Sequence, residues 1–149
     1  MIDYELLVKD PKAYLMRGWN IRNRVEAKQQ RIDYWRSVAE SVTAEVKQDG
    51  GFGNSYPKSK IESCAVKIAD LQAELNEDAQ ELIEIEKSVQ EAIKLIPDVG
   101  NVRFMFELRY LNYLSWEEVA VAIGYSERNL HYHHKNALEQ IKSLALAKM

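Results

Sequence analysis

This 149-residue chain has little cysteine and no long apolar run. The single cysteine, Cys64, excludes an internal disulfide framework and is typical of a protein from a reducing compartment. No apolar run approaches the roughly 20 residues that a membrane-spanning helix needs. Residues 1–10 alternate apolar and acidic side chains, whereas a targeting signal has a basic and then an apolar stretch. We therefore expect a soluble protein of the cytoplasm that does not bind a membrane.

The chain also lacks the residue groupings that an enzyme needs. Its only glycine-rich stretch, at residues 50–53, follows no expected strand, whereas a phosphate-binding loop does. Cys64 lies on an apolar stripe without a histidine nearby in sequence, which is typical of an unreactive thiol. The carboxylates are spread along helix faces. We expect no enzymatic activity and no cofactor.

The net charge of −3 conceals an uneven distribution. Residues 1–48 carry nine Lys/Arg against seven Asp/Glu, residues 49–98 carry five against eleven, and residues 99–149 carry six against five. Because phosphate contacts dominate nucleic-acid binding, the acidic middle segment is a poor DNA surface and the two ends remain candidates. Their basic excess is small, so one copy should bind DNA weakly. A homodimer, or docking on RNA polymerase, would have to add the rest.

Two long stretches repeat apolar residues at alternating spacings of three and four, the pattern of coiled-coil helices. The first consists of Ile21, Val25, Lys28, Ile32, Trp35, Ala39, Val42 and Val46. The second consists of Ile61, Cys64, Ile68, Leu71, Leu75, Asp78, Leu82, Ile85, Val89, Ala92 and Ile96. Each includes one charged residue, and we expect Lys28 and Asp78 to pair across the helices or to fix their register.

A loop predicted at residues 49–59 separates the two stretches, because glycine gives this segment a weak helix tendency. A short link between heptad helices favours an antiparallel hairpin, although an intermolecular coiled coil has the same heptads. Ahead of it, Tyr4–Val8 is expected to form a small helix, with Asp10-Pro11 as the capped start of the long one. We predict an all-α protein, with a helical hairpin over residues 1–97 and a separate small domain over residues 98–149.

The C-terminal segment contains the start and stop signals of short helices. Ser115 and Glu118 have the spacing of a capping box, in which each side chain accepts from the other's backbone N–H. Gly124 favours a left-handed helix end, and Ser126 can cap the next helix after a turn of about three residues. Such a tight joint forces the helices to cross steeply, which leaves the second helix free to enter a major groove.

Three helices are predicted here, over Val102–Asn112, over Trp116–Ile123 and from the residue after Ser126 towards the last residues. Helical spacing predicts buried side chains at Phe104 or Met105, Leu108, Leu111, Val119, Ala120, Ile123, Leu130, Ala137, Leu138 and Ile141, with Leu144 or Ala145 at the end.

The segment ELRYLNYLSWEEVAVAIGYSERNLHYHHKNALEQI resembles region 4 of bacterial sigma factors, the promoter-reading helix-turn-helix. The whole chain, with YLMRGWNIRNRVEAKQQRIDYWR before a glycine-containing gap and a Glu-rich helix, is similar to phage-encoded transcriptional regulators of the ArpU type. The sharper part of the match covers residues 104–141. This resemblance implies sequence-specific binding to double-stranded DNA and control of phage or mobile-element transcription in a bacterial host cell.

Seven residues at the start of the third helix are the candidate DNA contacts. They are Ser126, Glu127, Arg128, Asn129, His131, Tyr132 and Lys135. By chemistry, Arg128 suits guanine, Tyr132 a thymine methyl group and Lys135 a phosphate. Asn129 suits adenine or a phosphate, and Glu127 suits cytosine or only complements the helix dipole. The resemblance assigns base reading to Glu127, Arg128, His131 and Tyr132, where the family usually has more arginine.

Three further features have ordinary structural explanations. His131 and His134 share a helix face, but no third ligand is nearby in sequence, so we expect no metal site and a core position for His133 or His134. Arg109 is expected to form a salt bridge with Glu117 or Glu118. Trp19 suits either the core or a docking surface.

Two other functions also fit the sequence. In one, the sigma-like segment docks on RNA polymerase or another regulator without reading DNA, as its weak net charge allows. In the other, the chain is a structural coiled-coil assembly factor without affinity for nucleic acid.

Overall fold

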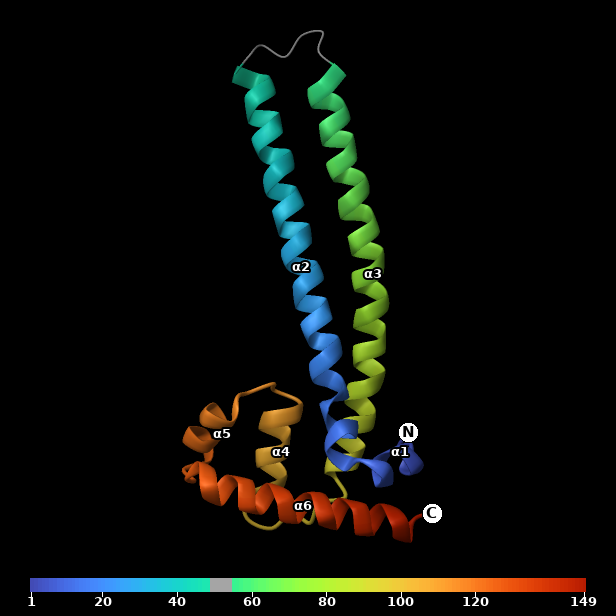
Figure 1. Ribbon diagram of the computed structural model, residues 1–149, viewed down its shortest axis with the longest axis vertical. Helices are drawn as coiled ribbons and strands as arrows, with labels where there is room; N and C mark the ends of the chain where they lie inside the picture. Colours follow the sequence, from blue (N-terminus) through green and yellow to red (C-terminus); the bar gives the residue numbers. More distant parts are fainter. Residues whose placement is uncertain (49–54) are drawn as a thin grey trace. The chain divides into compact units, whose positions relative to one another are not determined.

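The computed structural model describes residues 1–48 and 55–149, and this part of the chain forms six helices and no strand (Figure 1). The predicted all-α class with a long helical hairpin is confirmed. Residues 1–21 with 82–149 make one compact unit, which we call the base unit, and residues 22–81 make another, the hairpin unit. Within the described residues, no helix combines the length and apolarity needed to cross a membrane.

The hairpin consists of α2 (Pro11–Gln48) and α3 (Ser55–Ile93), which run antiparallel. The side chain of Val46 lies outside the described ones. All other heptad positions predicted from the sequence are buried or half-buried. In the hairpin unit, the most buried apolar positions are Ile32, Val42, Cys64 and Leu75. The two predicted stripes therefore form the seam between the helices.

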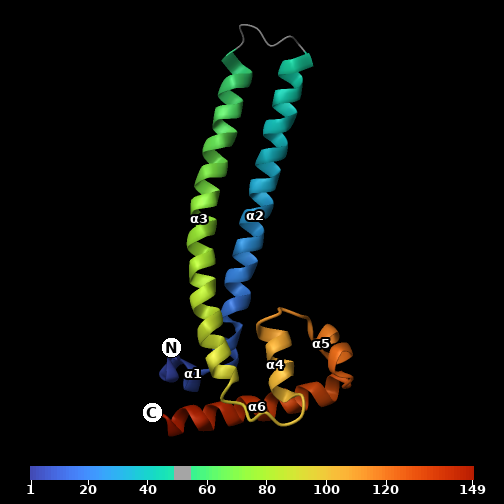
Figure 2. The same cartoon turned by 180° about the vertical axis from the view of Figure 1, so that it is seen from behind.

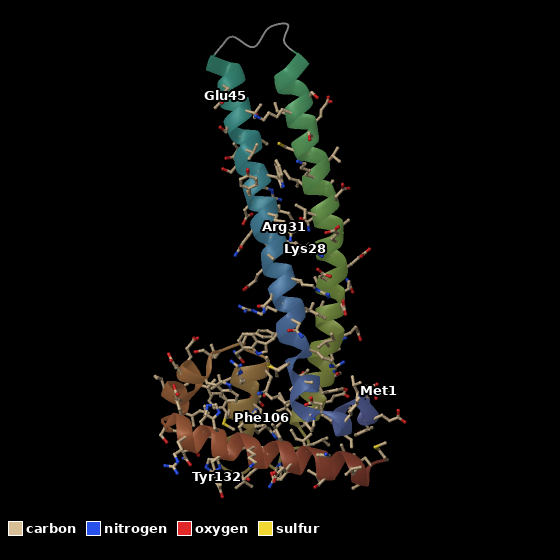
Figure 3. All side chains as sticks on the ribbon, viewed as in Figure 1. Met1, Lys28, Arg31, Glu45, Phe106 and Tyr132 are labelled. Carbon is tan, nitrogen blue, oxygen red and sulfur yellow. The ribbon has the colours of Figure 1, made fainter. Side chains whose placement is uncertain are left out.

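The charged residues of the seam pair with each other, as predicted. Lys28 donates from Nζ to a carboxylate oxygen of Asp78 at 2.6 Å, and Figure 3 shows Lys28 between the two helices. Glu74 lies 3.7 Å from Lys28, and Arg24 lies 3.7 Å from Asp78 and 3.2 Å from Glu81. This ladder of ion pairs balances the basic residues of α2 against the acidic residues of α3.

The prediction of a loop over residues 49–59 placed the end of the loop too late in the sequence. Helix α3 begins at Ser55, so residues 55–59 are helical, and residues 49–54 lie outside the described residues. Pro57 is compatible with this start because the first turn of a helix does not use its backbone N–H groups.

The base unit begins with α1 (Tyr4–Lys9), which ends one residue before α2. The Asp10 carboxylate accepts from the backbone N–H of Ala13 at 3.1 Å, so the predicted small helix and the capped start at Pro11 are confirmed. The unit continues with α4 (Val102–Tyr110), α5 (Trp116–Ile123) and α6 (Glu127–Ala147). Helix α1 packs against α6, as Figure 2 shows from behind.

One core joins the parts of the base unit. It includes Leu7, Tyr14 and Leu15 near the N-terminus, the end of α3, and the inner faces of α4, α5 and α6. Residues 98–149 therefore belong to a compact unit that also contains residues 1–21 and 82–97. The division into a hairpin over residues 1–97 and a separate domain over residues 98–149 stays a prediction. Between α3 and α4, the Arg103 guanidinium donates to the carbonyl oxygen of Ile96 at 2.6 Å, which holds this connection in place.

Candidate nucleic-acid interface

Helices α5 and α6 are joined as the sequence predicts. Ser115 Oγ accepts from the backbone N–H of Glu118 at 3.1 Å, and Glu118 Oε1 accepts from the backbone N–H of Ser115 at 3.2 Å, which completes the capping box. Gly124 ends α5 with φ +81° and ψ +24°, a conformation that a Cβ atom would strain. Ser126 Oγ accepts from the backbone N–H of Asn129 at 3.2 Å and starts α6. Three residues separate the two helices.

The buried face of this helix pair agrees with most of the prediction. Val119, Ala120, Leu130, Ala137 and Ile141 are buried, and Ala145 takes the final position, where the alternative Leu144 is exposed. The predicted Ile123 and Leu138 are half-buried against the same core.

Helix α4 is shorter than predicted, and its buried face includes two residues, Phe106 and Tyr110, that were not predicted. It ends at Tyr110, and its buried residues are Met105, Phe106 and Tyr110. Leu108 and Leu111 are half-buried, and Phe104, which was the alternative to Met105, is 47% exposed. The aromatic pair Phe106 and Tyr110 sets this orientation because both rings pack against His134 of α6.

All seven predicted DNA contacts lie on the exposed side of α6, in its N-cap and first turns. The exposed residues are Ser126, Glu127, Arg128, Asn129, His131, Tyr132 and Lys135. Figure 3 shows Tyr132 projecting from α6 on the side away from α4, whereas Phe106 lies between α4 and α6. Two of these seven residues also make contacts within the protein. Ser126 caps the helix with its hydroxyl, and His131 contacts the Trp116 ring edge-on at 5.1 Å.

His134 occupies the core position that the sequence left open between His133 and His134. Its Nε2 is 2.6 Å from the Tyr110 hydroxyl, and its ring stacks on Phe106 at 5.1 Å and meets Trp116 edge-on at 4.6 Å. Burial, together with the nearby Lys12, His131 and Arg109, lowers the pKa of His134 to about 4. His134 is therefore neutral at physiological pH and braces α6 from beneath. His133 is half-buried against Tyr125.

The salt bridge predicted between Arg109 and Glu117 or Glu118 is wrong: among the described residues, neither carboxylate pairs with Arg109. Instead the guanidinium lies over the rings of Trp19, at 4.5 Å, and Trp116, at 4.8 Å. It also donates to the carbonyl oxygen of Leu114 at 3.0 Å. Arg109 turns inward because the faces of two indole rings attract its cation. The Glu118 carboxylate instead accepts from the backbone N–H of Ser115 in the capping box.

Through Arg109, this cluster connects Trp116 at the start of α5 with Trp19 in the N-terminal part of α2. The Trp19 indole N–H donates to the carbonyl oxygen of Arg109 at 2.9 Å, and its ring packs against the core. Of the two roles expected for Trp19, core or docking surface, the structure shows the first. Tyr113, a non-glycine residue with φ +59°, donates to Glu86 at 2.5 Å and meets Trp19 edge-on. Gly18 leaves room for this ring, because a Cβ at Gly18 would lie 3.0 Å from the Tyr113 hydroxyl. The sequence analysis did not predict this cluster. Trp19, Arg109 and Trp116 were visible in the sequence, but no spacing indicated that they lie together.

The exposed face of α6 combines hydrogen-bonding groups with a modest charge. Arg128 and Lys135 are its cations in the first three turns, and Glu127 lies at the positive end of the helix dipole. Across the described chain, no group of three or more His, Cys, Asp and Glu side chains is arranged to hold a metal ion.

No protein-family model matches this chain, and neither a curated protein nor a solved structure matches it.

Proposed function

We propose that this protein is a sequence-specific regulator of transcription that reads double-stranded DNA with the first turns of α6. In this proposal, α5 and α6 are a helix-turn-helix like that of sigma-factor region 4, and the genes controlled belong to a phage or mobile element in the cytoplasm of a bacterial host. The observation that carries the proposal is the capped pair α5–Gly124–α6, with seven hydrogen-bonding or aromatic side chains left exposed at its reading end.

Rigidity supports this function. A reading helix must hold its side chains in register with base edges, which requires support from beneath. The His134–Tyr110 hydrogen bond, the Ser126 cap and the packing of Leu130 and Ala137 hold α6 in one position on the core. His134, Leu130 and Ala137 lie on the buried side of α6, so of these supporting groups only Ser126 is also a candidate DNA contact.

The small positive charge sets a second requirement. With six Lys/Arg against five Asp/Glu in residues 99–149, one copy neutralises few phosphates. We therefore propose that the protein acts as a dimer on two half-sites, or together with RNA polymerase, so that two weak contacts act at once.

Substitution of Arg128 tests base reading directly. Duplexes are selected from a random-sequence pool with the full chain, and the dissociation constant of the best duplex is measured at fixed salt. Arg128→Ala should weaken binding by about 10- to 100-fold, the cost of one lost bidentate contact to a base. Arg31→Ala removes the same charge from an exposed position of α2 and should change binding little. Equal affinities of Arg128→Ala and the unmodified chain would exclude base reading by α6.

A second candidate function is favoured by the outer face of α5. Val121 is 85% exposed beside the exposed carboxylates of Glu117 and Glu118, which suits a protein surface better than phosphates. In this alternative the base unit docks on RNA polymerase or another regulator without reading DNA. Binding to DNA that falls steeply with added salt and protects one sequence from cleavage supports the first function; absence of both supports the second.

A further inference from the structure

Tyr132 is the large apolar side chain that α6 presents at its reading end. It is 62% exposed, whereas Phe106 and Tyr110 of the same unit are almost completely buried. Figure 3 shows it projecting away from α4. An aromatic ring in water contributes little to folding, but it offers a large apolar surface to a ligand.

The Tyr132 ring is supported from the core by two further rings. It meets His133 edge-on at 5.5 Å, and His133 lies tilted against Tyr125 at the same separation. Tyr125 is half-buried and packs on the hydrophobic core. This row of rings restricts the positions that Tyr132 adopts before any ligand arrives, which lowers the entropy cost of an apolar contact.

Tyr132 is bracketed by cations on the same helix face. Arg128 precedes it by four residues and Lys135 follows it by three, spacings at which side chains lie about 5–6 Å apart. Successive bases of one DNA strand are about 3.4 Å apart along the axis. Side chains one helical turn apart therefore reach base pairs within about two steps of each other.

Resting on the proposed function, we infer that Tyr132 reads the C5-methyl group of a pyrimidine in the major groove, within about two base pairs of a guanine held by Arg128. Thymine and 5-methylcytosine both present this group at the same edge of the base. The ring supplies the apolar surface for the methyl group, and Arg128 supplies the donors for guanine O6 and N7. The chain would then prefer sites in which these two bases are neighbours or next neighbours.

Removal of single methyl groups tests this inference. In the best duplex selected with the full chain, each thymine is replaced in turn by deoxyuridine, which pairs identically but lacks the methyl group. One replacement, within about two base pairs of an essential guanine, should weaken binding about fourfold, the cost of leaving one carbon group unburied. A parallel series replaces each cytosine with 5-methylcytosine, and strengthened binding at one position would identify that base as the source of the methyl group.

The variant Tyr132→Ala connects the effect to this side chain. It should still bind the duplex, more weakly, but its affinity should no longer distinguish thymine from deoxyuridine at the sensitive position. Tyr34→Ala is the matched control, because Tyr34 is 60% exposed on α2. It should keep the full methyl dependence.

The outcomes separate this inference from the function on which it rests. Failure to enrich any duplex would overturn both. Sequence-specific binding without an effect of deoxyuridine or 5-methylcytosine at any position would overturn only the role of Tyr132. Tighter binding to the unpaired strand than to the duplex would also overturn it, because the ring would then stack on a free base.

Discussion

The hairpin unit and the base unit each bury a titratable side chain, and the two burials differ in kind. Asp78 in the hairpin unit and His134 in the base unit are 9% and 7% exposed. Asp78 is an ion-pair partner, with Lys28 at 2.6 Å and Arg24 at 3.7 Å. His134 is surrounded by the rings of Phe106, Tyr110 and Trp116 and has a hydroxyl as its hydrogen-bonding partner.

Equal burial therefore does not produce equal chemistry. A seam between two helices has solvent on both sides, so long cations can approach Asp78 while keeping contact with water. The core of the base unit brings aromatic rings from α4 and α5 around His134, and this environment favours the neutral imidazole. Asp78 has cations as its neighbours and His134 has aromatic rings, so a similar exposed fraction does not imply a similar environment.

The largest effect is expected from removing the ring on which His134 stacks. Phe106 is completely buried, so Phe106→Ala should lower the free energy of unfolding by about 3–5 kcal/mol, measured by urea denaturation. If the two units are separate, hydrogen exchange should accelerate in α4, α5 and α6 and change little in residues 22–48. Equal acceleration of hydrogen exchange in both units would show that they unfold as one cooperative structure. The hairpin unit and the base unit could then not be compared as separate units.

The second prediction concerns pH. Because burial lowers the pKa of His134 from 6.5 to about 4, the unfolded chain binds a proton more readily than the folded one between these values. Stability is then complete above pH 6.5 and is lost as the pH falls towards 4. Between pH 7 and pH 5 the free energy of unfolding should decrease by about 2 kcal/mol.

His134→Gln provides the control for this pH dependence. Glutamine keeps a polar partner for the Tyr110 hydroxyl but does not titrate, so the loss of stability between pH 7 and pH 5 should largely disappear. A variant as sensitive to pH as the unmodified chain would assign the effect to other groups.

The third prediction concerns the ion pair of the hairpin. Asp78→Ala leaves Lys28 on the apolar seam with Glu74 at 3.7 Å as its remaining carboxylate. The cost should be about 1–2 kcal/mol, less than for a fully enclosed pair, because the Lys28 and Asp78 side chains are still 19% and 12% exposed.

Replacing both partners with leucine should restore the stability of the unmodified chain or exceed it, since an apolar pair on the seam needs no desolvation of charge. If the double variant is as unstable as Asp78→Ala, the ion pair contributes more than it costs to bury. Urea denaturation of the three proteins decides between these results.

The elements that were predicted correctly depend on local signals. The bounds of α5 follow from Ser115, Glu118 and Gly124, which act through hydrogen bonds and backbone conformation within a few residues. The two heptad stripes identified the seam, and the Lys28–Asp78 pair followed from their register. The exposed face of α6 was predicted because helical periodicity separates it from Leu130 and Ala137.

The features that were missed depend on residues far apart in the sequence. Arg109 leaves its expected carboxylate partners because Trp19, ninety positions earlier, supplies one of two ring faces and a hydrogen bond. The orientation of α4 is likewise set by His134, twenty-four positions later. Neither pairing has a spacing rule that could be read from the chain. DNA contact by α6 is also still a prediction, since it concerns a partner and not the fold.

The smallest effect is expected from a local signal of the base unit, the cap of α5. Ser115→Ala removes the acceptor for the Glu118 backbone N–H and should lower the free energy of unfolding by about 1 kcal/mol. Ser37 lies exposed inside α2 of the hairpin unit, where Ser37→Ala should be neutral or slightly stabilising because alanine favours the helix. The same chemical change would thus have opposite consequences in the two units. Equal effects of the two substitutions on the urea midpoint would mean that the cap adds nothing to the packing of Val119 and Ala120, and that α5 is held by the core alone.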